Sequence, residues 1–310
     1  MITLVLSQSI LAAQNTSVYD ATAHPGPTSA ALGSSSTQPF QTYQEENIGN
    51  LSAVENWHLP CTRELGNRYS LEAQQLGQSY AQHVETTSRL ITDAGIAEYL
   101  NRIGQNLARN SQAQVQLTVK IIDTDDLNAF ALPTGLIFVD SGLILAADNE
   151  AELAAVISHE IAHMAGCHAA RAIAREELTS IASMPLIFRL VFRRAIQNTV
   201  YLKPDRSYEF EADFLGIEYL YKAGYDPRAI TSILEKLTAI EKQKGSPGSL
   251  ESHSLMTDRI KRTRQKINTL SPPAAEYKLD TSQFQEMKKR LSELRNRQTS
   301  TRTAAQMVLN

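Results

Sequence analysis

Two histidines and a glutamate near the middle of the chain have the spacing of a metal site. His159, Glu160 and His163 form the pattern H-E-x-x-H in a stretch with helical periodicity. Because histidines four residues apart project from one helix face, both imidazoles can bind a single zinc ion. Glu160 follows the first of them and can take a proton from a water molecule that the zinc activates. The pattern therefore predicts a zinc site suited to hydrolysis.

A catalytic zinc needs a third protein ligand and one position left open for water. The candidates lie in the acidic run between Glu209 and Asp213. Glu209 and Asp213 share one face of a predicted helix, whereas Glu211 points away from both. One face can thus supply a ligand and a carboxylate that orients a ligating histidine through its second ring nitrogen. The residues alone leave Glu211 open as the alternative ligand.

The elements that must hold these residues follow from hydrophobic periodicity and capping residues. Apolar and polar residues alternate over 115–121 and predict a half-buried strand, and 128–139 predicts two extended runs broken at Pro133–Gly135. Pro133 cannot donate a ladder hydrogen bond, which favours an edge position. Helices are expected at 70–87, 93–110, 149–180, 206–223, 227–243, 257–269 and 282–297. The pattern predicts a mainly helical α+β domain with a small sheet.

The N-terminal region differs in composition from the rest and sets the expected domain boundaries. Residues 1–19 are expected to be a secretory signal or an apolar tail, although no Lys or Arg precedes Arg63. The Ser-, Thr- and Pro-containing residues 20–45 predict a flexible linker. The folded domain is expected over 46–298, followed by a tail at 299–310.

Composition excludes several classes of protein. The 310 residues include 30 Lys and Arg against 33 Asp and Glu, a formal net charge of −3. This balance argues against a nucleic-acid-binding protein. No run of 18 apolar residues is present, so a membrane-spanning helix is not expected. Two cysteines are too few for a disulfide scaffold or a cysteine-rich zinc finger.

Taken together, the H-E-x-x-H pattern and the later Glu-Phe-Glu-Ala-Asp run resemble peptidase family M48, the zinc metallopeptidases, and most of all its soluble periplasmic members. The segment from Asn128 to Gly135 resembles the family's strand ahead of the catalytic helix, and Gly224–Pro227 resembles its turn after the glutamate-bearing helix. The resemblance implies a zincin (gluzincin) fold whose edge strand flanks the active-site helix. It also implies one zinc ion per chain, with Glu209 as the third ligand.

Further site residues follow from the same resemblance. His253 and Arg259 match a later histidine and arginine of the family, and are expected to assist catalysis or, for His253, to gate the zinc. The Ser-, Gly- and Pro-containing residues 245–254 predict a loop at His253. Ser254 stands where the family usually has proline. A substrate would lie extended along Ala129, Phe130, Ala131 and Leu132, gaining main-chain hydrogen bonds.

Three other features are predicted to lie outside the chemistry. His168 follows His163 by five residues, about 140° around a helix, and is expected to make a structural hydrogen bond. Cys167 is expected to be a packed thiol; a zinc ligand or a disulfide with Cys61 are the alternatives. Residues 181–200 mix apolar residues with arginine and are expected to form a lid, the alternative being contact with the membrane surface.

The preferred hypothesis is therefore a zinc-dependent endopeptidase that hydrolyses unfolded or misassembled proteins in the bacterial periplasm or cell envelope. Its partners would be polypeptide substrates, with membrane or outer-membrane assembly proteins as peripheral contacts and no nucleic acid. The alternative is a zinc-bound, chaperone-like module that holds envelope clients with little proteolysis. Glu160 favours the enzyme, because a purely structural zinc site has no use for a general base.

Overall fold

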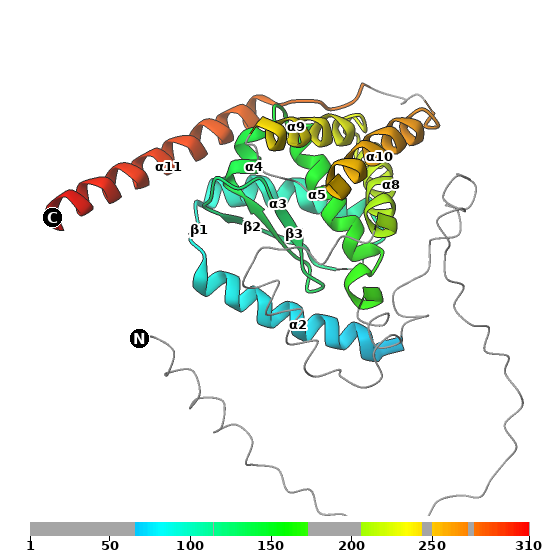
Figure 1. Ribbon diagram of the computed structural model, residues 1–310, viewed down its shortest axis with the longest axis horizontal. Coiled ribbons are helices and arrows are strands. Elements are labelled where there is room, and N and C mark those ends of the chain that lie inside the picture. The colour runs from blue at the N-terminus through cyan, green and yellow to red at the C-terminus, as the bar shows by residue number, and fades with distance from the viewer. Residues whose placement is uncertain (1–65, 114, 173–205, 244–249, 272–275, 310) are drawn as a thin grey trace, which may run out of the picture. The chain divides into compact units, whose positions relative to one another are not determined.

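Figure 1 shows the computed structural model of the chain, which describes residues 66–113, 115–172, 206–243, 250–271 and 276–309. All of them belong to the second of two compact units, residues 54–310. The signal segment, the linker, Cys61 and the lid expected at 181–200 fall outside the described residues. Within the described ranges, no helix has the length and apolar character needed to span a bilayer.

The described strands form one mixed sheet in the order β1-β2-β4-β3. The strands are β1 (Leu90–Ile91), β2 (Thr118–Ile122), β3 (Ala129–Ala131) and β4 (Leu136–Asp140). β2 and β4 run parallel, whereas β1 and β3 are antiparallel to their neighbours. β3 is thus an edge strand, as the proline after it indicated. A turn through Gly135, whose φ is +85°, joins it to β4.

Both faces of the sheet are covered by helices (Figure 1). On one face lies α2 (Gly66–Thr87), where Tyr80 packs on Phe130 of β3 with ring centroids 5.6 Å apart. The other face packs on α3 (Ala94–Arg109) and α5 (Glu150–Ala165). The predicted strand at 115–121 begins later, at Thr118, but three of its alternating apolar residues, Leu117, Val119 and Ile121, are buried against these helices as expected.

Helix α3 forms where its capping residue and apolar stripe predict it. The carboxylate of Asp93 accepts a hydrogen bond from the Ile96 N–H at 3.1 Å and so caps the helix. The stripe is at most 2% exposed and consists of Ile96, Leu100, Ile103 and Leu107. The predicted helix over 93–110 is therefore confirmed.

Helix α5 begins as predicted but ends earlier. The Asn149 side chain accepts from the Glu152 N–H at 3.0 Å, which caps the helix start. The expected continuation to residue 180 is wrong, because the helix stops at Gly166. Cys167 then adopts a φ of +55°, which no α-helix can contain, and a new helical segment begins at His168.

The remaining described helices are α4 (Ser141–Ala146) and four helices that follow α5 in the sequence. These four are α8 (Arg206–Lys222), α9 (Ala229–Gln243), α10 (Leu250–Ile267) and α11 (Ser282–Leu309). α8 packs on α5, and α10 packs on α8 and α9. α10 starts seven residues before its predicted start at 257, so position 253 is helical rather than part of a loop.

Two buried glutamates fix the start of α5 to the rest of the domain. Glu150 is 1% exposed and accepts hydrogen bonds from the hydroxyls of Tyr99 (2.5 Å) and Tyr225 (2.8 Å). Its carboxylate also contacts Lys278 and Thr281. These four partners come from α3, the turn after α8 and the segment before α11, so one carboxylate joins three regions that are distant in sequence.

Glu152, two residues later on the same helix, makes the corresponding connection to α9. Its carboxylate lies 2.6 Å from both the Lys236 ammonium and the Ser232 hydroxyl. It also accepts from the main-chain N–H of Asp148 at 2.8 Å. Both carboxylates are buried, and each oxygen contacts at least one partner. The helix that carries the H-E-x-x-H pattern is therefore held in one position at its N-terminal end.

We predict that Glu150→Gln destabilises the fold. An amide cannot accept from all four partners, and its NH₂ group would face their donors, so the free energy of unfolding should fall by about 1–3 kcal/mol. Urea unfolding of the purified protein measures this change. Glu286→Gln, at an exposed position on α11, is the matched control and should stay within about 0.5 kcal/mol of wild type. Equal stability of the two variants would contradict the anchoring role of Glu150.

Candidate active site

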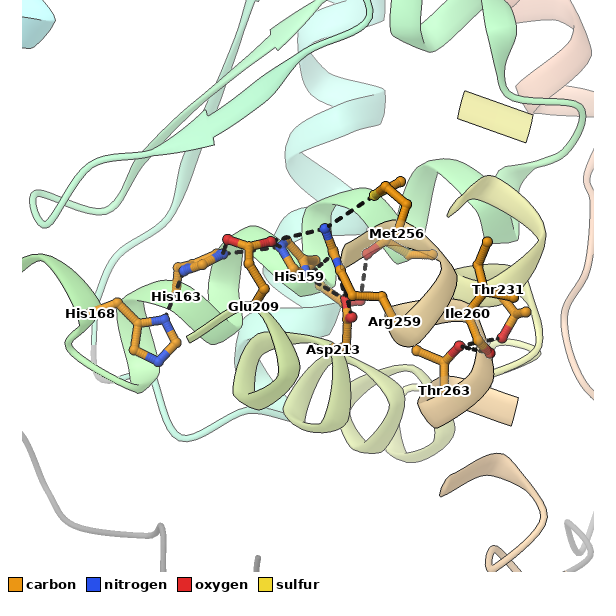
Figure 2. Close-up of polar contacts among 12 residues, drawn as sticks. His159, His163, His168, Glu209, Asp213, Thr231, Met256, Arg259, Ile260 and Thr263 are labelled. Atoms are coloured by element: carbon orange, nitrogen blue, oxygen red, sulfur yellow. Dashed lines mark hydrogen bonds and ion pairs between the residues drawn. The ribbon is translucent and has the colours of Figure 1, made fainter. Parts of the chain in front are cut away.

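The side chains of His159, His163 and Glu209 converge between α5 and α8 (Figure 2). The two Nε2 atoms lie 3.0 Å apart, and each lies 3.5 Å from an oxygen of Glu209. Ligands of a tetrahedral zinc at about 2.0–2.1 Å lie roughly 3.4 Å from one another. Two imidazole nitrogens and a carboxylate, at these separations, are a donor set that fits zinc.

Glu209 reaches this point because α8 approaches α5 closely. Gly216 lies two turns after Glu209 on the same helix face. A Cβ atom at Gly216 would lie 3.3 Å from the Ser158 hydroxyl and 3.4 Å from the main-chain nitrogen of His159. The glycine therefore leaves room for the two backbones to meet beside the first histidine. This residue is not among the predicted site residues, although a glycine on the face of Glu209 and Asp213 indicates close packing.

The outer nitrogen of His159 has a carboxylate partner. Asp213, one turn after Glu209, is 1% exposed and places Oδ1 3.0 Å from His159 Nδ1. This contact directs the Nε2 atom of His159 toward His163 and Glu209. Glu209 and Asp213 thus lie on the face of α8 that meets α5.

Arg259, on α10, lies against both acids of α8. Its Nε and Nη2 atoms donate to the two oxygens of Asp213 at 2.8 and 2.7 Å. Its Nη1 atom lies 2.9 Å from Glu209 Oε2. The guanidinium therefore orients the carboxylates and compensates their buried charge (Figure 2).

The charges within the cluster shift the pKa values of its members. Burial alone would raise the pKa of Glu209, but Arg259 and the two histidines outweigh it and hold that pKa well below its usual range. Burial acts against a charged His159, yet hydrogen bonds to Asp213 and Glu209 raise its pKa to about 9. A metal ion that binds here must displace the proton of His159.

Glu160 lies on the side of α5 that faces the sheet edge. Burial raises the pKa of its carboxyl group to about 7, opposed by the charge of His159 and by a hydrogen bond from the main chain of Ala131. A base with a pKa near neutrality can both accept and return a proton. Ala131 belongs to β3, so the candidate base and the edge strand adjoin.

The register of β3 decides which of its main-chain groups face outward. Leu132 donates to the Leu136 carbonyl, and Asp140 donates to the Asn128 carbonyl. Since hydrogen-bonded pairs alternate along an antiparallel ladder, Phe130 also pairs toward β4. The N–H and C=O groups of Ala129 and Ala131 therefore point away from β4. Of the four predicted substrate-binding residues, these two offer main-chain groups at the edge.

His168 lies against the metal-site cluster, a position that its spacing from His163 did not predict. The turn at Gly166–Cys167 returns the chain, and the Nδ1 atoms of His168 and His163 lie 2.7 Å apart (Figure 2). Behind His168, its Nε2 atom lies 3.3 Å from Glu211 Oε2, and Arg171 donates to the same oxygen at 2.8 Å. The signal that could have revealed this turn is Gly166, a residue that commonly ends helices.

Two other predictions concern Cys167 and His253. The prediction of a packed thiol at Cys167 is wrong, because the residue is disulfide-bonded. The only other cysteine of the sequence is Cys61, which lies outside the described residues. Position 253 lies near the start of α10, six residues before Arg259, but the His253 side chain is also outside the described part of the molecule.

Comparison with known proteins places these residues in a family. The chain is 28% identical over 218 residues to the beta-barrel assembly-enhancing protease of Escherichia coli (strain K12), a match over 65% of this chain and 45% of that protein. It is 32% identical over 214 residues to the putative protein of the same name from Vibrio cholerae, over 63% of this chain and 44% of the relative. The mitochondrial metalloendopeptidase OMA1 of Schizosaccharomyces pombe is 29% identical over 191 residues, 59% of this chain and 55% of the relative.

The chain thus spans about half the length of these curated relatives. The model of peptidase family M48 matches residues 96–267, which is more than half of the chain. Since that match runs from α3 to the end of α10 and includes His159, His163 and Glu209, the chain belongs to peptidase family M48, a family of metallopeptidases.

Proposed function

We propose that this chain is a zinc-dependent endopeptidase that hydrolyses unfolded or misassembled polypeptides. The observation that carries the proposal is the position of Glu160 between a three-residue metal site and the outward main-chain groups of β3. The site combines a place for one zinc ion, a base and an edge on which a peptide can pair. A client-binding module would need only the first and the last of these.

His159, His163 and Glu209 would hold the zinc ion, and their donor set leaves a fourth position for water. Zinc, when bound, lowers the pKa of water and polarises the scissile carbonyl. Glu160 takes the proton of the attacking water and passes it to the leaving amine. Asp213 orients His159 through its Nδ1 atom, and Arg259 keeps Glu209 ionised and in position.

The substrate would add to the sheet as an extended segment along β3. Ala129 presents an N–H donor and a C=O acceptor outward, and Ala131 presents its C=O, because its N–H donates to Glu160; Phe130 packs its ring on Tyr80 and Phe138. Recognition through main-chain groups depends little on the substrate's side chains. It does require a segment that is not already paired, which favours unfolded or misassembled proteins.

For location, we propose the bacterial periplasm or cell envelope. The disulfide bond at Cys167 is typical of an oxidising compartment. Two relatives carry the name beta-barrel assembly-enhancing protease, which suggests a role beside outer-membrane assembly proteins. A role in envelope protein quality control follows from the same resemblance.

Two further roles rest on the family resemblance. Arg259 is proposed to support catalysis through the two carboxylates that it contacts. His253 is proposed to gate the site, because a fourth ligand would displace the water that the reaction needs. Turnover and bound zinc, measured together for His253→Ala, distinguish a gate from a ligand. A gate predicts retained zinc with unchanged or higher turnover.

We predict that Glu160→Gln abolishes cleavage while zinc remains bound. The amide keeps the shape of the side chain but cannot accept a proton, so turnover should fall by at least about 10²-fold. Casein cleavage and zinc content are measured on the same preparation. Glu241→Gln, exposed on α9, is the control and should behave as wild type. If Glu160→Gln retained full turnover, the proposed mechanism would be wrong.

We also predict that Ala129→Pro weakens cleavage of an unfolded substrate. Proline removes one outward N–H group without removing a bond to β4, so kcat/KM should fall roughly three- to tenfold, the effect of one hydrogen bond. Ala129→Ser keeps the N–H and serves as the matched control. Zinc content should be unchanged in both variants. Equal kcat/KM for the proline and serine variants would exclude pairing at this position.

A further inference from the structure

We propose that His168 and Glu211 are positioning residues for His163, and that the two histidines of the metal site are held by different outer partners. This inference rests on the proposed zinc site. It concerns the residues behind the ligands, where His168 contacts the ligand His163 and Glu211 contacts His168. The chain of contacts runs from α5 through the segment after Cys167 to the face of α8 opposite Glu209.

The distances determine where the ring protons must be. His163 turns its Nε2 atom toward His159 and Glu209, so Nε2 is the ligand atom. Its Nδ1 atom then carries the hydrogen and donates to His168 Nδ1, 2.7 Å away. A neutral His168 that accepts at Nδ1 carries its own hydrogen on Nε2. That atom faces Glu211 Oε2 at 3.3 Å, an electrostatic contact rather than a well-aligned hydrogen bond.

His168 sits in a slot that admits little else. Its ring stacks on Tyr208 with centroids 4.5 Å apart and an interplanar angle of 10°. On another side, a Cβ atom at Gly166 would lie 2.5 Å from His168 Nε2, so the glycine is required for the ring to occupy this place. His168 is 5% exposed and Glu211 is 3% exposed. The slot therefore holds the acceptor nitrogen in one direction, toward His163.

Arg171 completes the arrangement behind the acid. It donates to Glu211 at 2.8 Å and lies over the Tyr208 ring at 4.7 Å. His159, in contrast, meets a carboxylate directly, since Asp213 lies 3.0 Å from its Nδ1 atom. His159 thus has a carboxylate as its outer partner. His163 has the neutral imidazole of His168, which in turn contacts the Glu211 carboxylate. The orientation of His163 depends on His168 in the way that the orientation of His159 depends on Asp213.

The test compares His168→Asn with His168→Phe. An asparagine can place its side-chain oxygen near the former Nδ1 position and accept from His163, but it loses the stacking on Tyr208. A phenylalanine keeps the stacking and offers no acceptor. Zinc affinity, measured by competition with a chelator, should fall about 10- to 100-fold in the phenylalanine variant. The asparagine variant should lie closer to wild type. Ala169→Ser, at the exposed neighbouring position, is the control.

A purely structural role for His168 predicts the opposite order, with phenylalanine the milder change. Wild-type zinc affinity in the phenylalanine variant, or weaker zinc binding in the asparagine variant than in the phenylalanine variant, would overturn the proposal. The visible spectrum of the cobalt-substituted proteins gives a second measurement, since a rotated His163 ligand changes its bands. Wild-type protein that binds no zinc would instead refute the proposed function, so the two failures are distinguishable.

Discussion

The ion pairs of Arg259 with Asp213 and Glu209 are the interaction on which the site depends. Two carboxylates one turn apart on α8, the buried Asp213 and the largely buried Glu209, face the same histidine. Without a compensating cation they would repel each other and take up protons. Arg259 supplies the cation from α10 with three donor atoms. Since removal of one partner from a buried pair typically costs about 3–5 kcal/mol, α8 and α10 cannot separate without loss of the site.

The helix that carries the H-E-x-x-H pattern is fixed at both ends by different means. Glu150 and Glu152 attach its first turn to four other parts of the domain through buried polar contacts. At the other end, Gly166 stops the helix and the disulfide-bonded Cys167 turns the chain. The middle of the helix is left to apolar packing against the sheet and α8. The two histidines are therefore carried by an element with little freedom to rotate or slide.

How much of this could be predicted from the sequence depends on the range of the interactions. His159, Glu160 and His163 lie on one helix, so local spacing predicts that they meet. The choice between Glu209 and Glu211 as ligand depends on which face of α8 meets α5, and that is a property of tertiary packing. Gly216, on the face of Glu209, was the available signal for it.

The errors of the sequence analysis have equally local causes. The stop of α5 does not follow from hydrophobic periodicity, which continues past Gly166; the helix ends at this glycine because Cys167 adopts a left-handed φ. The start of α10 was placed too late because its first turns contain serine and histidine, which are weak helix formers. Each wrong helix boundary gives a histidine the wrong position: His168 away from the metal-site cluster, and His253 in a loop.

The shortness of β3 has a consequence for how long any peptide stays bound. The strand is three residues long, and only Ala129 and Ala131 direct main-chain groups outward. At about 0.5–1.5 kcal/mol for each hydrogen bond, such an edge cannot retain a segment tightly, so residence times on it are brief. The short edge also limits aggregation between copies of the chain, because long exposed edge strands pair with strands of other molecules. If peptides pair here as proposed, an edge this small would bind many extended segments weakly and hold none of them for long.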